Sequence, residues 1–137
     1  MLPMPPDVRA AFEAFPPEVR HRLAEIRAII LDVAAGDDRI GAITERLKWG
    51  EPAYLTAETG SGSTVRLGRP RGRPDCAAVY FICHTPLVEA FRARFGALFE
   101  YEANRAVLLP VSGEVALVPL EMMLSAALTY HLRQPGG

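Results

Sequence analysis

Four side chains in two short segments have chemistry that suits a binding site. They are Lys48, Trp49, Tyr54 and Arg105. The two aromatic side chains each bury a large apolar area while keeping a polar tip, and the arginine offers a planar fork of donors to a carboxylate or phosphate. This combination predicts a site for a small anionic ligand or for a peptide. The alternative, that the same four side chains only hold the fold together, stays open on the sequence alone.

The cysteines and histidines show no spacing that is typical of a catalytic or metal site. Cys76 and Cys83 are seven residues apart in one apolar run, so we expect them on opposite faces of a strand, buried as small hydrophobic residues. The histidines, His21, His84 and His131, show none of the HxH, HExxH or CxxC patterns. We therefore predict no catalytic residue, no metal ligand and no cofactor, while a site assembled from distant segments stays open.

Two loops resemble known binding motifs without their usual surroundings. The Gly-Ser-Gly-Ser run at 60–63 lacks the Gly-Lys-Ser/Thr that completes a phosphate-binding loop, and it is predicted to be a hairpin loop. Arg69, Arg71 and Arg73 lie in a segment similar to an AT-hook, which inserts arginines into the minor groove of DNA. Because no basic helix accompanies them, we predict a mobile, exposed loop between neighbouring strands and no specific binding of nucleic acid.

The composition indicates a single globular domain over residues 1–137. Half of the residues are apolar, 23% are charged, and 16 acidic against 15 basic side chains leave a net charge of -1. This balance indicates neither a polyanion-binding protein nor an acidic tail, and two cysteines exclude a disulfide scaffold. The N-terminus lacks the pattern of a signal peptide, and no apolar run approaches the ~18 residues of a membrane span. We expect a cytoplasmic protein with no membrane partner.

Four segments have the apolar spacing of helices that pack on one side. Residues 7–15 predict a short helix, and Pro16-Pro17 separates it from a helix over 18–36 with apolar residues every three or four positions. A third helix begins at Pro86, with Thr85 as its N-cap, and ends at Gly96. The last helix begins at Pro119. Its apolar stripe is Leu120, Met123, Leu124, Ala127 and Leu128, with His131 as a candidate addition.

Short extended runs lie between these helices. Strands are predicted at 40–49, 53–55, 64–67, 76–83 and 106–109, with a break at Gly50-Glu51-Pro52. Residues 40–49 suit a strand because Gly41 and β-branched Thr44 disfavour a helix, and the apolar run 76–83 indicates a central strand covered on both faces. The order of elements predicts an α+β domain, a mainly antiparallel sheet with N-terminal helices, one inserted helix and a C-terminal helix packed on it.

Three segments carry a family resemblance. They are Lys-Trp-Gly-Glu-Pro-Ala-Tyr-Leu-Thr at 48–56, Val-Tyr-Phe-Ile-Cys-His-Thr at 79–85 and Phe-Glu-Tyr-Glu-Ala-Asn-Arg at 99–105. They resemble the YdhG-like family of small bacterial domains, mostly of unknown function, over about residues 17–132. The resemblance implies an α+β fold. The family has glycine where this chain has Ala103, so the corner at 103 is expected to be less sharp here or to need no positive φ. The family's frequent glutamine at the position of His84 argues against an essential ligand there.

Three functions follow, in order of preference. The first is a non-enzymatic binding module for a small anionic ligand or a peptide partner. The second comes from the resemblance, since at least one YdhG-like member is linked to iron chaperoning with a frataxin-like shape. Against it, Asp37-Asp38 and the Glu100/Glu102 pair are the only local acidic clusters, and arginines interrupt the acids of the first two helices. The third is an enzyme of unknown class. The partner and the oligomeric state stay open.

Overall fold

Two helices, four strands, one helix, two strands and a last helix follow one another along residues 3–133, the part of the chain that the computed structural model describes. The helices are α1 (Pro6–Ala14), α2 (Pro17–Ala35), α3 (Leu87–Phe95) and α4 (Leu117–Leu128). The strands are β1 (Thr44–Lys48), β2 (Glu51–Leu55), β3 (Val65–Gly68), β4 (Cys76–Tyr80), β5 (Glu100–Glu102) and β6 (Ala106–Pro110). Short 3-10 turns follow α3 at Gly96–Leu98 and α4 at Tyr130–Arg133. Residues 1–2 and 134–137 of the predicted domain lie outside the described part.

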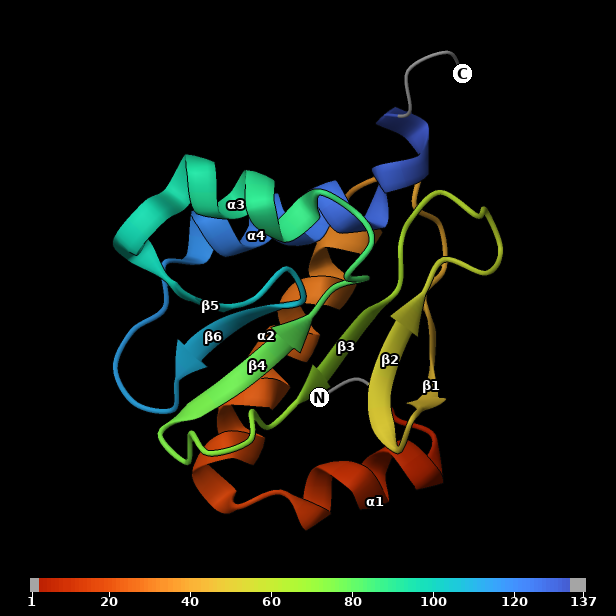
Figure 1. The fold of residues 1–137 in the computed structure, drawn as a ribbon. Coiled ribbons are helices and arrows are strands. Elements are labelled where there is room, and N and C mark those ends of the chain that lie inside the picture. The colour runs from red at the N-terminus through yellow and green to blue at the C-terminus, as the bar shows by residue number, and fades with distance from the viewer. Residues whose placement is uncertain (1–2, 134–137) are drawn as a thin grey trace.

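The strands form one antiparallel sheet in the order β1-β2-β3-β4-β6-β5 (Figure 1). The helices pack on one face of it: α2 crosses behind the middle strands, and α1 lies beside the β1–β2 end. We call the other face, which none of these four helices covers, the open face. The predicted α+β domain with a mainly antiparallel sheet is confirmed. Strand β5 was not predicted, because three residues are too few to show an alternating pattern.

The apolar stripe predicted for the second helix forms the centre of the core. Its fully buried members are Val19, Leu23, Ile26 and Ile30. They join one cluster with the helix-facing side chains of the sheet, such as Val79 and Val107. Arg22 is buried as well, and its Nε donates to the carbonyl of Pro110 at 2.8 Å. This bond ties α2 to the end of β6.

A two-residue turn joins β1 to β2. Lys48 pairs with Glu51, and Trp49 and Gly50 between them have φ values of 56° and 76°. Positive φ at both positions is what a type I′ hairpin turn requires. The turn therefore begins one residue before the predicted break, Pro52 belongs to β2, and Trp49 lies in the turn rather than on a strand.

The apolar run 76–83 is a strand only in its first part. All five residues of β4 are buried, which confirms a central strand covered on both faces. The last residue of the strand, Tyr80, pairs with Ala106, the first residue of β6. The chain then turns away, so Cys83 is exposed and the prediction of two buried cysteines on one strand is wrong for Cys83. Helix α3 begins one residue later than predicted, at Leu87.

The loop between β2 and β3 packs on the end of α4. Its Ser63 N–H donates to the carbonyl of Ala127 at 2.8 Å, and its Ser61 hydroxyl donates to the carbonyl of Leu128 at 2.8 Å. Gly62 lies so close to the Leu128 backbone that no Cβ fits there. The predicted hairpin loop therefore also satisfies carbonyls that a helix end leaves without partners. His131 lies beyond α4 and is exposed, so it does not extend the buried stripe.

Candidate functional site

The structure separates the four residues that the sequence proposed as a ligand site. Lys48 pairs with Glu51, and Tyr54 pairs with Glu45, three residues further along β2. Because side chains alternate along a strand, Lys48 lies on the open face and Tyr54 faces the helices. Trp49 stands at the tip of the β1–β2 turn, and Arg105 lies in the turn between β5 and β6. The four side chains therefore do not share one cleft.

Tyr54 belongs to a buried polar network. Its side chain is fully buried, and its hydroxyl donates to Oε2 of Glu45 at 2.7 Å. Arg27 of α2 donates to the same carboxylate through Nε at 2.6 Å and Nη2 at 2.9 Å. Burial, and then the neighbouring carboxylate, raise the pKa of Tyr54, while the hydrogen bond to Glu45 raises the pKa of Arg27. The contacts of Tyr54 hold α2 against the first hairpin.

Trp49 is the most exposed large hydrophobic residue of the described chain, at 89%. It occupies the first turn position with a left-handed backbone conformation, which disfavours any side chain other than glycine, asparagine or aspartate. A bulky aromatic residue thus stands in solvent at a position where its own backbone is strained. Fold stability does not explain its presence there, which keeps Trp49 a candidate contact residue.

Charged side chains close much of the open face. The Nε of Arg105 donates to Glu102 at 2.8 Å, and its guanidinium lies 5.5 Å from the ring of Tyr80. Arg66 lies 5.2 Å from the same ring and is paired with Glu51. Burial raises the pKa of Glu51, an effect that the two guanidinium groups oppose. Each arginine therefore already has a carboxylate partner at this face.

The arginine loop joins neighbouring strands β3 and β4, as predicted, but one of its arginines is held in place. Arg73 donates to Glu100 at 2.7 Å and to Asp75 at 3.1 Å. These bonds lower the pKa of both carboxyl groups. Arg69 and Arg71 are exposed, whereas Arg73 is part of the layer that covers the β4–β6 strands. The prediction that all three arginines are exposed on a mobile loop is wrong for Arg73, which is half-buried and bonded to Glu100 and Asp75.

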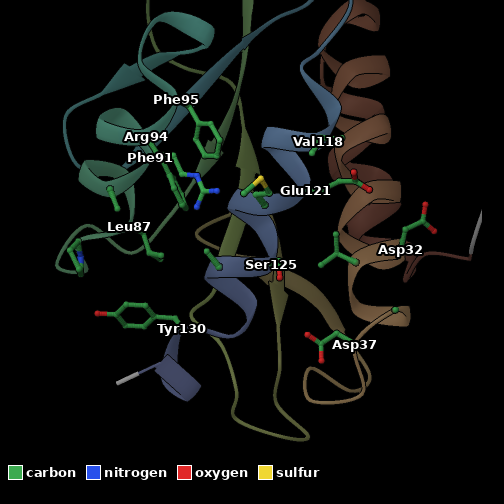
Figure 2. Close-up of a pocket in the computed structure, with 16 residues that line it drawn as sticks. Asp32, Asp37, Leu87, Phe91, Arg94, Phe95, Val118, Glu121, Ser125 and Tyr130 are labelled. Atoms are coloured by element: carbon green, nitrogen blue, oxygen red, sulfur yellow. The ribbon is translucent and has the colours of Figure 1, made fainter. Parts of the chain in front are cut away.

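An open groove lies on the helical side of the molecule, with α3 and α2 as its walls and α4 as its floor (Figure 2). Its volume is about 700 Å³. The α3 wall includes Leu87, Phe91, Arg94 and Phe95, and the α2 wall includes Asp32, Val33 and Asp37. The floor consists of Val118, Glu121, Met122, Ser125 and Ala126, with Tyr130 at one end. Of the described residues that line the groove, none is among the four proposed from the sequence.

The floor helix is apolar over most of its surface. Among the twelve residues of α4, only Glu121 and Ser125 are polar. One side of the helix packs into the core, while on the groove side Val118 is 63% and Met122 36% exposed. Apolar residues on a helix surface are normally covered by another part of a protein. The sequence predicted the buried stripe of α4 but not the groove residues Val118, Met122 and Ala126. Their spacing by four on the opposite side of the helix was the available signal.

Charges are distributed unevenly around the groove. Asp32 and Glu121 lie on its α2 side and Arg94 on its α3 wall, as Figure 2 shows. Asp37 is engaged by Arg39, which donates to its carboxylate at 2.7 Å and lowers its pKa. Within residues 3–133, the carboxylates of Asp32 and Glu121 take part in no ion pair or hydrogen bond. The groove therefore presents two unpaired carboxylates opposite one guanidinium.

The fold is similar to that of a crystal structure from Bacillus subtilis, the DUF1801 family protein YdhG. The two chains are 18% identical, the match covers 94% of each, and the TM-score is 0.62. The chain has the YdhG fold. The YdhG-like resemblance of the sequence is thus confirmed at the level of the fold. No family model and no curated protein matches the sequence.

The YdhG-like segments belong to the sheet and its turns rather than to the groove. Residues 48–56 include the first turn and β2, residues 79–85 follow from β4, and residues 99–105 include β5 and its turn. In that turn Ala103 has a φ of 48°, so the prediction that this corner needs no positive φ is wrong. Because Glu102 pairs directly with Ala106, three residues must reverse the chain, and Ala103 takes the left-handed conformation even without glycine.

The described residues also bear on metal sites, disulfides and membrane-spanning helices. In residues 3–133, no three His, Cys, Asp or Glu side chains group as a metal site would require, and Cys76 and Cys83 are both free. None of the described helices combines the length and apolarity needed to cross a bilayer. The groove on α4 is a concave feature with the size and apolar lining of a ligand site.

Proposed function

We propose that this protein is a non-enzymatic binding module that holds an elongated, mainly apolar ligand, a peptide or a small molecule, in the groove between α2, α3 and α4. The observation that carries the proposal is the uncovered apolar side of α4, with Val118 and Met122 in solvent at the groove floor. A volume of about 700 Å³ lies within the range of ligand pockets. The polar side chains at its edges would orient the ligand.

The apolar surface supplies a driving force of useful size. Completing the burial of a side chain such as Met122 or Val118 contributes at most about 1.5–3 kcal/mol, less the part that is already buried. Phe95 and Tyr130 add partly buried aromatic surface at the walls. Association costs several kcal/mol of translational and rotational freedom. The balance favours a ligand that contacts the whole floor rather than a fragment at one end.

Binding of the neutral apolar dye Nile red tests this proposal. We expect its emission to rise saturably with the protein, and we expect Ala126→Phe, which fills the middle of the floor, to weaken binding by about tenfold. The matched control is Ala10→Phe, the same substitution at an exposed position of α1. Circular dichroism of both variants checks that they fold. Dye binding that is absent, or equal in the two variants, would overturn the proposal.

A second candidate site is the tip of the first hairpin. Trp49 is exposed and strained there, next to Lys48, and Arg105 lies on the same side of the sheet as Lys48. We propose this surface for an anionic ligand. Trp49 is the only tryptophan, so its fluorescence reports on this tip alone. Titration with citrate or inorganic phosphate should change the emission, and Lys48→Ala should remove the change. Constant emission at millimolar ligand would exclude the site.

The iron-chaperone alternative is tested separately. Equilibrium dialysis with ferrous iron should show binding tighter than millimolar if iron is the cargo. Weaker binding would exclude this function. We also propose a cytoplasmic location, because both cysteines are unpaired and such thiols persist in a reducing compartment.

A further inference from the structure

We propose that the occupant of the groove is an amphipathic helix of a partner protein, whose apolar face lies on α4 and whose basic edge faces Asp32 and Glu121. This inference rests on the proposed binding function and specifies the ligand. Three features of the groove support it: the length of its floor, the small residues in its lining, and the placement of its charges.

The floor has the length that helical anchors require. On the groove side of α4, apolar residues recur every four positions, at Val118, Met122 and Ala126. They span about 12 Å at the rise of an α-helix. Tyr130 extends the groove beyond them. A bound helix presents anchors at i, i+4 and i+7, which cover about the same distance. The groove is therefore long enough for three anchor side chains in a row.

Small residues are part of the groove lining. Ser125 and Ala126 belong to the floor, Ala90 belongs to the α3 wall, and Gly36 lies on the α2 side. Larger apolar side chains lie toward the two ends, with Phe95 and Val118 at one and Tyr130 at the other (Figure 2). Packed helices approach to 8–10 Å when the side chains at the contact allow it. The small residues of the lining therefore leave room for the partner backbone, while the larger apolar residues at the ends hold its anchors.

The charges fix the orientation of the partner helix. Asp32 and Glu121 have no ion pair among the described residues, and both lie on the α2 side of the groove. Arg94 lies on the other wall, with its guanidinium 5.6 Å from the ring of Phe95. A helix with lysine or arginine along the edge toward α2 would pair with both carboxylates. A helix with acidic residues at that edge would be repelled, which gives selectivity by charge.

Synthetic peptides test the helix and its charge separately. The probe is a fluorescein-labelled eighteen-residue helical peptide with leucines at i, i+4 and i+7 of its apolar face and lysines along one edge. The second peptide has glutamates in place of the lysines, and the third has a proline in the middle, which breaks the helix. We expect the lysine peptide to bind about tenfold tighter than either of the others at low salt, measured by anisotropy.

Variants of the protein locate the binding. Ala126→Phe and the surface substitution Met122→Lys should each weaken binding of the lysine peptide, and Ala10→Phe should leave it unchanged. The double variant Asp32→Asn/Glu121→Gln should lose the preference for lysine over glutamate while still binding Nile red. Equal binding of the proline and lysine peptides, or of the glutamate and lysine peptides, would overturn this inference. If Nile red still binds in the groove, the proposed function survives; if neither dye nor peptide binds there, both fail.

Discussion

The first hairpin and the α4 groove differ in almost every respect that matters for function. The hairpin carries the distinctive Lys-Trp-Gly-Glu-Pro-Ala-Tyr segment, and its inward side is closed by the bonds of Glu45 with Arg27 and Tyr54. The groove carries no recognisable motif, and its floor leaves Val118 and Met122 in solvent. The segment that is easiest to recognise thus owes much of its composition to the fold, while common apolar residues build the larger concave surface.

Polar chemistry therefore plays a different part in each region. At the hairpin, Arg27 and Tyr54 both donate hydrogen bonds to the buried carboxylate of Glu45. Removing one member of this network therefore leaves the others without a partner and reduces stability. At the groove, two carboxylates are left unpaired beside an apolar floor. Substitutions in the first region should reduce stability, and substitutions in the second should reduce binding. The predictions below test this difference, beginning with the largest expected effect.

Removal of the central carboxylate of the buried network should destabilise the protein strongly. Glu45→Ala leaves the buried guanidinium of Arg27 without this counter-ion and Tyr54 without its acceptor. Breaking a buried pair in this way costs about 3–5 kcal/mol of unfolding free energy. Urea denaturation followed by circular dichroism measures the loss.

A double replacement provides the control. Arg27→Met with Glu45→Leu removes both charges, so it should cost less than Glu45→Ala alone. A loss below about 1 kcal/mol for Glu45→Ala would show that the network does not hold α2 to the hairpin, and the structural role given to this region would fail.

The fold was accessible from the sequence where local patterns agree with tertiary packing. The stripe Val19, Leu23, Ile26 and Ile30 predicts α2 because a period of three or four is unambiguous over its length. The first hairpin was less certain because Gly50 marks a turn without giving its register. Pairing of Lys48 with Glu51 sets the register, and this depends on contacts across the sheet.

The candidate site was not accessible in the same way. Its residues come from three helices, and Asp32, Arg94 and Ser125 are unremarkable in sequence. Their proximity depends on how α2 and α3 flank α4. A visible clue was the apolar outer side of α4, which indicates a missing cover but does not say which elements stand beside it. The predicted ligand residues lie apart for a related reason. Lys48 pairs with Glu51, which is three residues before Tyr54 on β2, so the side chains of Lys48 and Tyr54 point to opposite faces of the sheet.

At the tip of the hairpin, unlike in its buried network, a substitution should raise stability. Trp49→Asn places a residue that tolerates positive φ at the first turn position, so we expect stability to rise by about 0.5–1 kcal/mol. Trp49→Leu, which removes the indole but keeps an ordinary side chain, should bring no such gain. Urea denaturation compares the two variants. A loss of stability on Trp49→Asn would mean that the indole contributes contacts to the folded state.

The ion pairs of Arg73 with Glu100 and Asp75 on the open face should weaken in acid. The hydrogen bonds from Arg73 lower the pKa of Glu100 and of Asp75 in the folded state. Their contribution to stability is therefore present above the ordinary pKa of these groups and is lost as the pH falls through the lowered value. We expect the urea midpoint to fall below about pH 4, and Arg73→Ala to reduce this dependence. An equally steep loss in wild type and variant would contradict the assignment.

The smallest expected change in stability is at the groove floor, where two adjacent methionines provide a matched pair. Met123 is fully buried, so Met123→Ala should cost about 2–5 kcal/mol. Met122 faces the groove and is 36% exposed, so Met122→Ala should change stability by less than about 0.5 kcal/mol. The same variant should weaken the lysine peptide, because the contact it loses forms only with a ligand. If Met122→Ala instead cost as much as Met123→Ala, its side chain would be packed in solution as a core residue is, the groove would be closed, and the contrast between a fixed hairpin and an open binding surface would not hold.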